Sequence, residues 1–500
     1  MGKFCFPEDM SAVMIGSARR AAVTSVLAVL TLVVVVGDAS VGGANGKPVG
    51  RTAAPAVAQR LVAQRLVAQR LVAQQAPAEL GAVTAIAAGY GHSLALRSDG
   101  TVLAWGRNSE GQLGDGNLDP SVTPVRVCAV GQAAPCTRFL TGVIAIAAGF
   151  VHSVALLRDR TVVAWGQNVT GQLGDGTFTS RSVPVRVCAV GEVAPCSQFL
   201  SGVRAIASGD SDHNLALLGN GAVVAWGFNA FGQLGDGGYA GSPVPVRVCA
   251  VGESAPCGRF LTGARSIAVG EGHSLAVVGT GHAVAWGFNG AGEVGDGTSD
   301  NFRTIPVRVC AVGETAPCDR FLNGVSAVAA GAFHSMALLG SGSVVSWGYN
   351  VEGQVGDGTR DNHRLVPVRV CAQGQVAPCD RFLYGVRHIA ANGFHSMAQL
   401  SSGGVLAWGY NGYGQLGDGT RVNRLTPVRV CAVGEVAPCG RFLYLIRAIA
   451  AGIDHNLALQ PNYTVVDWGL NNHGQLGDGT TSDRPVPVQV LAPQGPAVVR

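Results

Sequence analysis

The chain has 500 residues, of which 47% are hydrophobic and 13% charged, and its 35 basic and 31 acidic residues give a net charge of +4. The basic excess is located in residues 45–80, which hold five basic residues and one acidic residue, while residues 81–500 hold 27 of each sign. Nucleic-acid-binding domains normally carry a basic excess. The charge distribution therefore excludes nucleic acid as the expected ligand of residues 81–500.

Residues 1–44 have the composition of an export signal. Arg19 and Arg20 precede an uncharged apolar run from Ala21 to Val36, and small residues follow this run. A basic segment, a short apolar segment and a small-residue exit are the parts of a secretory signal. The run is slightly short for a membrane span, so we expect cleavage, with an uncleaved anchor as the alternative. The mature protein is expected to be extracytoplasmic, meaning secreted, periplasmic or at the cell surface, with no membrane contact beyond the leader.

Residues 45–80 form a low-complexity linker. Within it, residues 57–75 repeat the pentapeptide Leu-Val-Ala-Gln-Arg between Pro55 and Pro77. A period of five matches neither a helix nor a strand, so the apolar residues form no lasting stripe. We expect a tether, and a partner-binding or surface-associated segment is the alternative.

Residues 81–492 contain one structural unit written seven times. Trp-Gly pairs recur at intervals of 60 or 61 residues, each with a histidine 13 residues before the tryptophan and a Gly-Asp-Gly triplet after it. A fixed period of this kind indicates a repeat architecture. The tryptophans are Trp105, Trp165, Trp226, Trp286, Trp347, Trp408 and Trp468. The histidines are His92, His152, His213, His273, His334, His395 and His455.

Each unit predicts about four short strands, because its apolar runs are rich in Val, Ile and Leu and are bounded by Gly, Asp, Asn or Pro. Seven such units favour a closed propeller over a solenoid, which would need polar capping repeats. The first unit opens at Val83 with no Pro-Val-Arg-Val run before it, and the last ends with Pro487-Val488-Gln489-Val490. We therefore predict an all-β, seven-bladed propeller of about 60-residue repeats, followed by a tail at 493–500. Its C-terminal strand is expected to complete the sheet begun by the N-terminal strands.

Two sequence runs recur through the units, with variations: Ala-Ala-Gly-x-x-His-Ser-Leu-Ala-Leu and Trp-Gly-x-Asn-x-x-Gly-Gln-Leu-Gly-Asp-Gly. They resemble the repeat of the regulator-of-chromosome-condensation (alpha-tubulin-suppressor-like) family, over more than 400 residues. The resemblance implies a seven-bladed propeller that binds other proteins on one face. Nuclear members of the family exchange guanine nucleotide on a small GTPase, and secreted bacterial relatives include inhibitors that cap beta-lactamases. A shared fold does not select among these functions, but the leader favours the secreted bacterial type.

Twelve of the 13 cysteines form six pairs with the spacing Cys-x7-Cys, in loops that the family pattern lacks. An even count outside the leader predicts local disulfides in an oxidising compartment. Reduced structural thiols and a metal site are the alternatives, although zinc sites use closer spacing and a second pair nearby. The pairs are Cys128 and Cys136, Cys188 and Cys196, Cys249 and Cys257, Cys310 and Cys318, Cys371 and Cys379, and Cys431 and Cys439.

The repeated histidines and Gly-Asp-Gly aspartates suggest a catalytic or metal-binding hypothesis, because these side chains bind metals and carry protons. In the run from His92 to Leu96, however, the two-residue period of a strand places the histidine on the face that packs against the next blade. We expect it to hydrogen-bond backbone across this interface, with each tryptophan wedged between blades. The aspartates are expected to form turns, and a cation site is the alternative. No catalytic residue, metal or cofactor is expected.

Large residues that differ among the units lie in two connections of each predicted blade, from its first to its second strand and from its third to its fourth. Both connections emerge on one face of an up-and-down ring, and the cysteine loops are expected on the opposite face. Aromatic residues at loop tips are typical of protein-binding hot spots, and packing over the blade tops is the alternative. The predicted partner-binding residues are Tyr90, Phe150, Phe228, Phe231, Phe288, Phe333, Tyr349, Phe394, Tyr410 and Tyr413.

The sequence as a whole predicts an exported propeller that is monomeric, binds a protein partner through loops on one face and catalyses no reaction. A guanine-nucleotide-exchange regulator of a small GTPase is the alternative. It rests on the family resemblance and conflicts with the leader and the cysteines. A glycan-acting or metal-dependent enzyme is a further alternative. Nucleotide hydrolysis is not suggested, because the chain contains no phosphate-binding Gly-x-x-x-x-Gly-Lys-Ser/Thr run.

Overall fold

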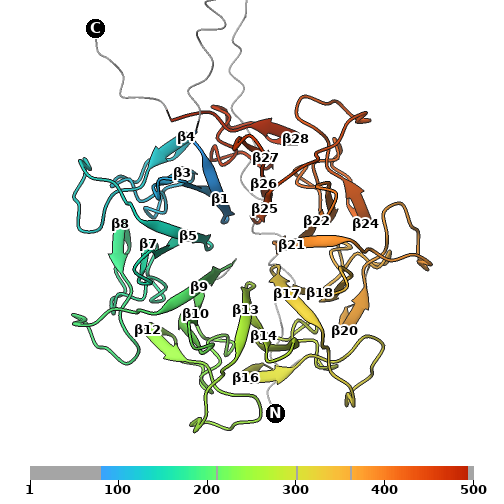
Figure 1. The fold of residues 1–500 in the computed structure, drawn as a ribbon, viewed down its shortest axis with the longest axis horizontal. Coiled ribbons are helices and arrows are strands. Elements are labelled where there is room, and N and C mark those ends of the chain that lie inside the picture. The colour runs from blue at the N-terminus through green and yellow to red at the C-terminus, as the bar shows by residue number, and fades with distance from the viewer. Residues whose placement is uncertain (1–79, 210–211, 300–301, 361–362, 494–500) are drawn as a thin grey trace, which may run out of the picture. The chain divides into compact units, whose positions relative to one another are not determined.

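The structure is a computed structural model that describes residues 80–209, 212–299, 302–360 and 363–493. These residues form seven four-stranded antiparallel sheets arranged as blades around one axis (Figure 1), which confirms the predicted seven-bladed, all-β propeller. The described part of the chain contains no helix, and therefore none that could cross a membrane. The predicted export signal, the linker up to residue 79 and residues 494–500 lie outside the described residues.

Each blade uses four consecutive strands, and the first two are the innermost pair (Figure 1). The innermost strands are β1 (Val83–Ala88), β5 (Val143–Ala148), β9 (Val203–Ser208), β13 (Ala264–Val269), β17 (Val325–Ala330), β21 (Val386–Asn392) and β25 (Ala448–Ala451). The second strands are β2 (His92–Arg97), β6 (His152–Leu157), β10 (His213–Leu218), β14 (His273–Val278), β18 (His334–Leu339), β22 (His395–Leu400) and β26 (His455–Leu459).

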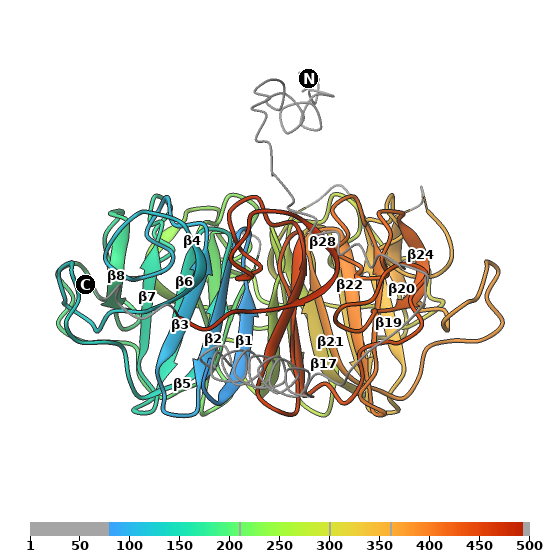
Figure 2. The ribbon, with the colours of Figure 1, turned by 90° about the horizontal axis from the view of Figure 1, so that it is seen from above.

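The third and fourth strands complete each blade toward the circumference. The third strands are β3 (Val102–Gly106), β7 (Val162–Gly166), β11 (Val223–Gly227), β15 (His282–Gly287), β19 (Val344–Gly348), β23 (Val405–Gly409) and β27 (Val465–Gly469). The outermost strands are β4 (Ser121–Arg126), β8 (Arg181–Arg186), β12 (Ser242–Arg247), β16 (Arg303–Arg308), β20 (Arg364–Arg369), β24 (Arg424–Arg429) and β28 (Arg484–Gln489). In a side view the strands run across the thickness of the ring, from one face to the other (Figure 2).

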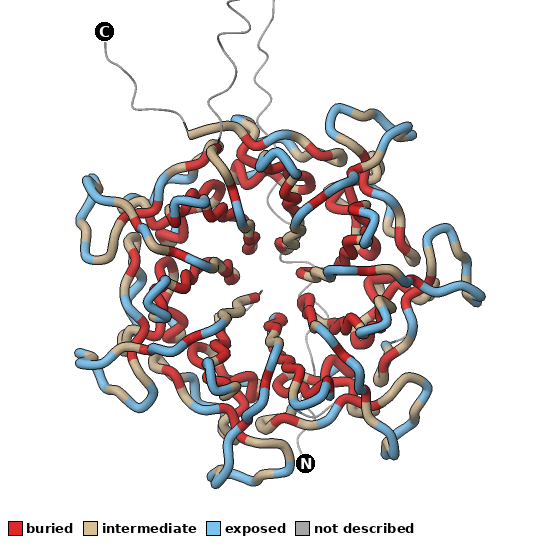
Figure 3. The backbone as a smooth tube through the Cα atoms, in the orientation of Figure 1, coloured by how far each residue is buried: buried red, intermediate tan, exposed pale blue. Residues whose placement is uncertain are grey.

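The two middle strands of each blade are buried on both sides, because each blade packs against two neighbours (Figure 3). This explains why the third strands read as continuous apolar runs, such as Val102 to Trp105, rather than as alternating polar and apolar residues. One core cluster joins Leu94, Leu96 and Ala104 of the first blade to Trp165 of the second. The hydrophobic core is therefore divided among the interfaces between blades.

The ring closes differently from the prediction. The C-terminal strand β28 pairs with β27 in the sheet of its own repeat, and β1 belongs to a separate sheet with β2, β3 and β4. The prediction of a shared sheet was wrong, because the first repeat already supplies four strands of its own. The seventh and first blades instead meet face to face, where β1 contacts β25 and β26.

The cysteine loops project outward from the circumference of the ring instead of covering the opposite face (Figure 1). Each loop follows an outermost strand and is closed by a disulfide whose Cα atoms lie 5.7 or 5.8 Å apart. An antiparallel bridge pairs the first cysteine with a phenylalanine further along, as in Cys128 and Phe139. The ring of Phe139 in turn lies under the Arg126 guanidinium, 5.2 Å from it. The six loops are thus copies of one stapled element on the rim.

We expect non-reducing peptide mapping of the protein to recover six disulfide links, each within one loop, because the two cysteines of every pair already lie at bonding distance. Closing a loop of this size stabilises the folded state by about 2–3 kcal/mol in the chain-entropy model. Mapping with and without prior alkylation distinguishes bonded from free thiols. Links between different blades, or a full set of alkylated cysteines, would contradict the assignment.

Candidate protein-binding face

All seven repeat histidines are buried between blades, where each bonds a polar side chain of the next blade. His92 Nε2 lies 2.9 Å from Ser153 Oγ, and Ser153 Oγ donates to the Gln112 carbonyl oxygen at 2.9 Å. Since the serine hydrogen is used in that bond, His92 Nε2 acts as the donor. The seven pairs are His92 and Ser153, His152 and Asn214, His213 and Ser274, His273 and Ser335, His334 and Ser396, His395 and Asn456, and His455 and Ser93.

The histidines therefore bond across the interface as expected, but to a side chain rather than to backbone. The backbone carbonyl is reached by the tryptophan, as Trp165 Nε1 donates to the same Gln112 oxygen at 2.9 Å. Burial lowers the pKa of His92 to about 3, helped by the charges of neighbouring histidines, and burial lowers the pKa of the other six. Buried, neutral rings of this kind hold the blades together.

The Gly-Asp-Gly aspartates organise turns, as their sequence context predicts. Asp296 accepts hydrogen bonds from the Thr298 amide at 3.1 Å and from its hydroxyl at 2.6 Å, and Arg303 Nε donates to it at 2.7 Å. Five blades contain this aspartate–arginine pair. Within the described residues, no group of three or more His, Cys, Asp or Glu side chains is arranged to hold a metal ion.

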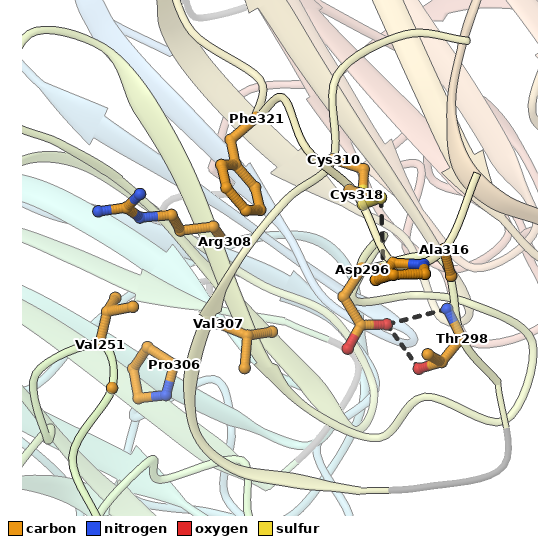
Figure 4. A pocket seen from close by; sticks show the side chains of 12 residues that line it. Val251, Asp296, Thr298, Pro306, Val307, Arg308, Cys310, Ala316, Cys318 and Phe321 are labelled. Carbon is orange, nitrogen blue, oxygen red and sulfur yellow. Dashed lines mark hydrogen bonds between the residues drawn. A yellow bond between two sulfur atoms is a disulfide. The ribbon is translucent and has the colours of Figure 1, made fainter. Parts of the chain in front are cut away.

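A hollow of about 650 Å³ lies on the rim between two neighbouring cysteine loops (Figure 4). Its lining comes from Val251 on one loop, from Pro306 and Val307 on β16, and from the next loop with its disulfide and Phe321. Asp296 also lines it, but its carboxylate turns toward Thr298. None of the ten predicted partner-binding aromatics contributes to this hollow, which is built from residues of the repeat itself.

The structure places the ten predicted aromatics in three groups of contacting, half-buried rings. The largest group, which we call the aromatic belt, connects the third to the sixth blade through Phe228, Phe231, Phe288, Phe333, Tyr349 and Phe394. Tyr90 stacks on Phe150 at 4.7 Å, and the Arg107 guanidinium lies 5.5 Å from the Tyr90 ring. Tyr410 packs edge-on against Tyr413. The rings support one another and keep part of their surface free.

Three members of the belt were missed in the sequence. Tyr239 and Phe302 contact each other at 6.4 Å, Phe302 contacts Phe231 and Phe288, and His363 stacks on Tyr349 at 5.1 Å. Tyr239 is 57% exposed and Phe302 is 40% exposed, more than any of the predicted residues. They lie in the same third-to-fourth connections, beyond the Gly-Asp-Gly triplet, where the units also differ. That variation was the available signal.

Acidic side chains lie beside the aromatic rings on this face. They follow the innermost strands. Glu271 stands at the position that Tyr90 and Phe150 occupy in other blades, whereas Asp212 and Asp454 directly precede the buried histidine. Burial raises the pKa of Glu271 and of Asp454 to about 7, and burial raises the pKa of Asp212 against the opposing effect of His152. Asp454 Oδ1 accepts a hydrogen bond from Gln415 Nε2 at 2.9 Å. The face therefore combines apolar rings with carboxyl groups whose pKa values are raised by burial.

These features define a class of protein, a β-propeller whose blades repeat one His–Trp interface. The regulator of chromosome condensation (RCC1) repeat matches residues 99–156, 161–217, 220–277, 280–338, 341–399, 402–459 and 467–500. A second description of the same repeat matches residues 83–112, 143–172, 203–233, 325–354 and 386–415. Since these matches cover more than half of the sequence, the chain belongs to the RCC1 repeat family.

Relatives with different names share most of their length with this chain. It is 29% identical to the ultraviolet-B receptor UVR8 of Arabidopsis thaliana over 418 residues, which cover 83% of either chain. It is 30% identical to the mitochondrial RCC1 domain-containing protein RUG3 of Arabidopsis thaliana, over 78% of this chain and 82% of that one. It is 29% identical to the secretion-regulating guanine nucleotide exchange factor of Mus musculus, over 78% and 79% respectively.

Solved structures show the same fold. Human WBSCR16 and Prp20p from Saccharomyces cerevisiae both align with a TM-score of 0.60 and 22% identity over 79% of this chain. The alignments cover 95% of WBSCR16 and 87% of Prp20p.

Proposed function

We propose that the protein is an exported, non-catalytic scaffold of the secreted bacterial type, which binds a protein partner through the aromatic belt. The observation that carries this proposal is the continuous set of ring contacts from Phe228 to Phe394, with Phe302 and Tyr239 exposed at its edge. Aromatic side chains are enriched at protein interfaces, where a few residues carry most of the binding free energy. Rings that already contact one another lose little conformational freedom on binding, which favours affinity.

Export is supported by the leader and by the cysteines. Six disulfides are typical of an oxidising compartment, since the cytosol keeps thiols reduced. Cell fractionation combined with thiol alkylation tests this part of the proposal. Recovery of the protein in the cytosol with its cysteines reduced would contradict it.

Guanine-nucleotide exchange is the second candidate function, and the similarity to the mouse exchange factor favours it. Exchange requires a folded GTPase as the partner, so it would use a protein-binding face in any case. Release of labelled nucleotide from a small GTPase, stimulated by the purified protein, distinguishes an exchange factor from a scaffold. The cysteines and the leader weigh against it, because small GTPases are cytosolic.

We expect that Phe288→Ala, Phe302→Ala and Tyr349→Ala each weaken the free energy of partner binding by about 2 kcal/mol or more. The melting temperature should stay nearly unchanged. Each ring lies at the surface, outside the core clusters between the blades, so its loss should affect folding less than binding. A partner captured with the wild-type protein, then purified and titrated by calorimetry, gives the comparison.

Phe178→Ala is the matched control for these variants. Phe178 is 59% exposed in the third-to-fourth connection of the second blade and makes no ring contact among the described residues. It should bind the partner as the wild type does. The belt is the wrong site if Phe178→Ala weakens binding as much as the belt variants, or if the belt variants bind normally.

A further inference from the structure

The face opposite the aromatic belt carries an excess of arginine. It consists of the second-to-third strand turns and of the short segments that lead into the innermost strands. We call it the arginine face. Its turns are residues 97–101, 157–161, 218–222, 278–281, 339–343, 400–404 and 459–464. Its leading segments are residues 80–84, 141–144, 201–204, 262–265, 323–326, 384–387 and 444–447. These segments hold seven arginines, namely Arg97, Arg158, Arg160, Arg204, Arg265, Arg387 and Arg447, but only two acidic residues, Asp99 and Asp159.

The two aspartates offset only part of the positive charge of the arginine face. Asp99 and Asp159 accept hydrogen bonds from Thr101 and Thr161 within their own turns, and Asp99 also lies 3.6 Å from Arg97. The other six arginines form no ion pair with any residue that the structure describes. By contrast, every arginine that begins an outermost strand forms an ion pair with the Gly-Asp-Gly aspartate of its blade. The cations of this face are therefore available to an external anion.

Four of the arginines occupy one position of the repeat, at the start of the innermost strand. In the third blade the pairing of β9 with β10 skips Arg204, which makes it the extra residue of a β-bulge. Arg265 and Arg387 are the bulged residues of their blades, and Arg447 directly precedes β25. This position is exposed in all seven blades. Since the innermost strands of all blades begin on the same face of the ring, the four exposed arginines lie on one face, in the third, fourth, sixth and seventh blades.

Backbone strain on the same face points to a function. Three non-glycine residues of the described chain have a positive φ, namely Arg160 at 67°, Leu445 at 55° and Tyr463 at 67°. The other blades have glycine at these two repeat positions, as at Gly100 and Gly385. A side chain is disfavoured in left-handed backbone, and such strain persists mainly at functional sites. All three substitutions add an exposed side chain to the arginine face.

Exposed apolar surface accompanies the cations on the sixth and seventh blades. Tyr444 is 69% exposed, and its neighbour Leu445 is 57% exposed. The guanidinium of Arg447 lies over the ring of Tyr463, 4.4 Å from its centroid. Tyr384, at the repeat position of Tyr444 one blade earlier, is 77% exposed. Cationic and apolar groups thus alternate along this edge of the face.

We propose that the arginine face binds an acidic polypeptide segment, a second interaction that goes beyond the proposed function of the aromatic belt. Its carboxylates pair with Arg204, Arg265, Arg387 and Arg447, since the planar guanidinium matches a carboxylate in charge and geometry. Its apolar side chains pack on Tyr444, Leu445 and Tyr463. A polypeptide fits better than another polyanion, because it alone places apolar side chains beside carboxylates along one chain.

Fluorescence polarisation of the full-length protein with a labelled peptide of repeated Glu-Glu-Leu triplets tests this proposal. We expect binding that weakens as salt rises, since the contacts are exposed ion pairs. Replacing Arg204, Arg265, Arg387 and Arg447 together by serine, the residue that the fifth blade has at Ser326, should weaken binding at least about tenfold, equivalent to 1.4 kcal/mol. Replacing Arg259, Arg320, Arg381 and Arg441 of the rim by serine removes the same charge and should leave the peptide Kd within about twofold.

The glycine variants Leu445→Gly and Tyr463→Gly separate a binding role from a structural one. They restore the residue of the other blades, so they should keep or raise the melting temperature while weakening peptide binding. The proposal is overturned if the peptide does not bind, if the four-serine variant of the rim loses as much affinity as the four-serine variant of the arginine face, or if both glycine variants bind normally. It is equally overturned if a heparin fragment or single-stranded DNA competes as well as the peptide at equal charge, because binding would then be that of any polyanion.

Discussion

Replacing Trp347 by alanine is expected to lower the free energy of unfolding by about 3–5 kcal/mol, the usual cost of deleting a large core aromatic. Trp347 is completely buried between the fourth and fifth blades, and its Nε1 donates to the Glu293 carbonyl oxygen at 2.8 Å. The ring also packs so closely on Gly295 that a Cβ there would lie 2.6 Å from Nε1. The cavity left by alanine cannot be filled from either blade without moving a sheet.

The measurement is equilibrium unfolding in denaturant, followed by fluorescence and by circular dichroism. Tyr384→Ala serves as the control, because the Tyr384 ring is 77% exposed and its loss should change stability by less than about 0.5 kcal/mol. The seven interfaces share one design. A comparable loss is therefore expected for a tryptophan of any other blade, and a Trp347→Ala variant as stable as the wild type would disprove the wedge role.

The parts of the fold that the sequence predicts well are those repeated in every unit. His92 and Trp105 recur in every unit because His92 bonds the next blade and Trp105 bonds the preceding one. Every blade makes these two contacts in the same way. The cysteine pairs are equally local, since the members of each pair are eight positions apart in the sequence. Local spacing and strand periodicity carry this information, so no knowledge of the ring was required.

What the sequence could not supply depends on contacts between units. The hydroxyl of Ser153 as the partner of His92 follows from how two blades approach each other, not from a spacing. The belt contact between Phe231 and Phe302 joins two blades through loops whose paths a period does not define. The ring closure was predicted wrongly for a related reason: a spare strand at the C-terminus does not reveal whether it pairs with β27 or with β1. Counting four strands in the first repeat would have favoured β27.

Departures from the repeat proved more informative than the repeat itself. The strained residues Leu445 and Tyr463 stand where other blades have glycine, and both are visible in an alignment of the units. A buried aspartate is a further departure that an alignment of the units reveals. Asp467 stands where the other blades have a small neutral residue, such as Ala104 or Ser346. It lies at the interface that closes the ring, next to Leu457 of β26 in the neighbouring strand.

Asp467 is a stability defect at this closing interface. Its side chain is completely buried, and neither carboxylate oxygen has a hydrogen-bond partner within the described residues. The nearby Ser93 hydroxyl is already engaged by the Gln475 carbonyl and by His455. Burial raises the pKa of Asp467 well above its ordinary value, and it outweighs the opposing effects of the nearby Trp468 amide and Ser93 hydroxyl. The folded protein must therefore hold this carboxyl protonated, or bury a charge.

We expect Asp467→Ala to raise the free energy of unfolding at pH 7 by about 2–4 kcal/mol, the cost of a buried polar group without a partner. A carboxyl whose pKa is raised on folding stabilises the protein fully below the unfolded-state pKa of about 3.9, and this contribution is lost as pH rises through the folded-state pKa. The advantage of the alanine variant should consequently be largest at neutral pH and shrink on acidification. Denaturant unfolding of both proteins at several pH values measures this difference.

Comparing the two proteins at each pH removes the effect of the interface histidines, which weaken the folded state of both as pH falls below about 6.5. The reciprocal variant Ala407→Asp, at the same repeat position of the sixth blade, should lose about as much stability as Asp467→Ala gains, since Ala407 is also completely buried. Equal and opposite effects would show that burial of the carboxyl alone sets this cost, and that the closing interface has no special means of stabilising an acid. If Asp467→Ala is instead destabilising at pH 7, the carboxyl has a partner at the closing interface, and the seventh blade departs from the other six for a structural reason.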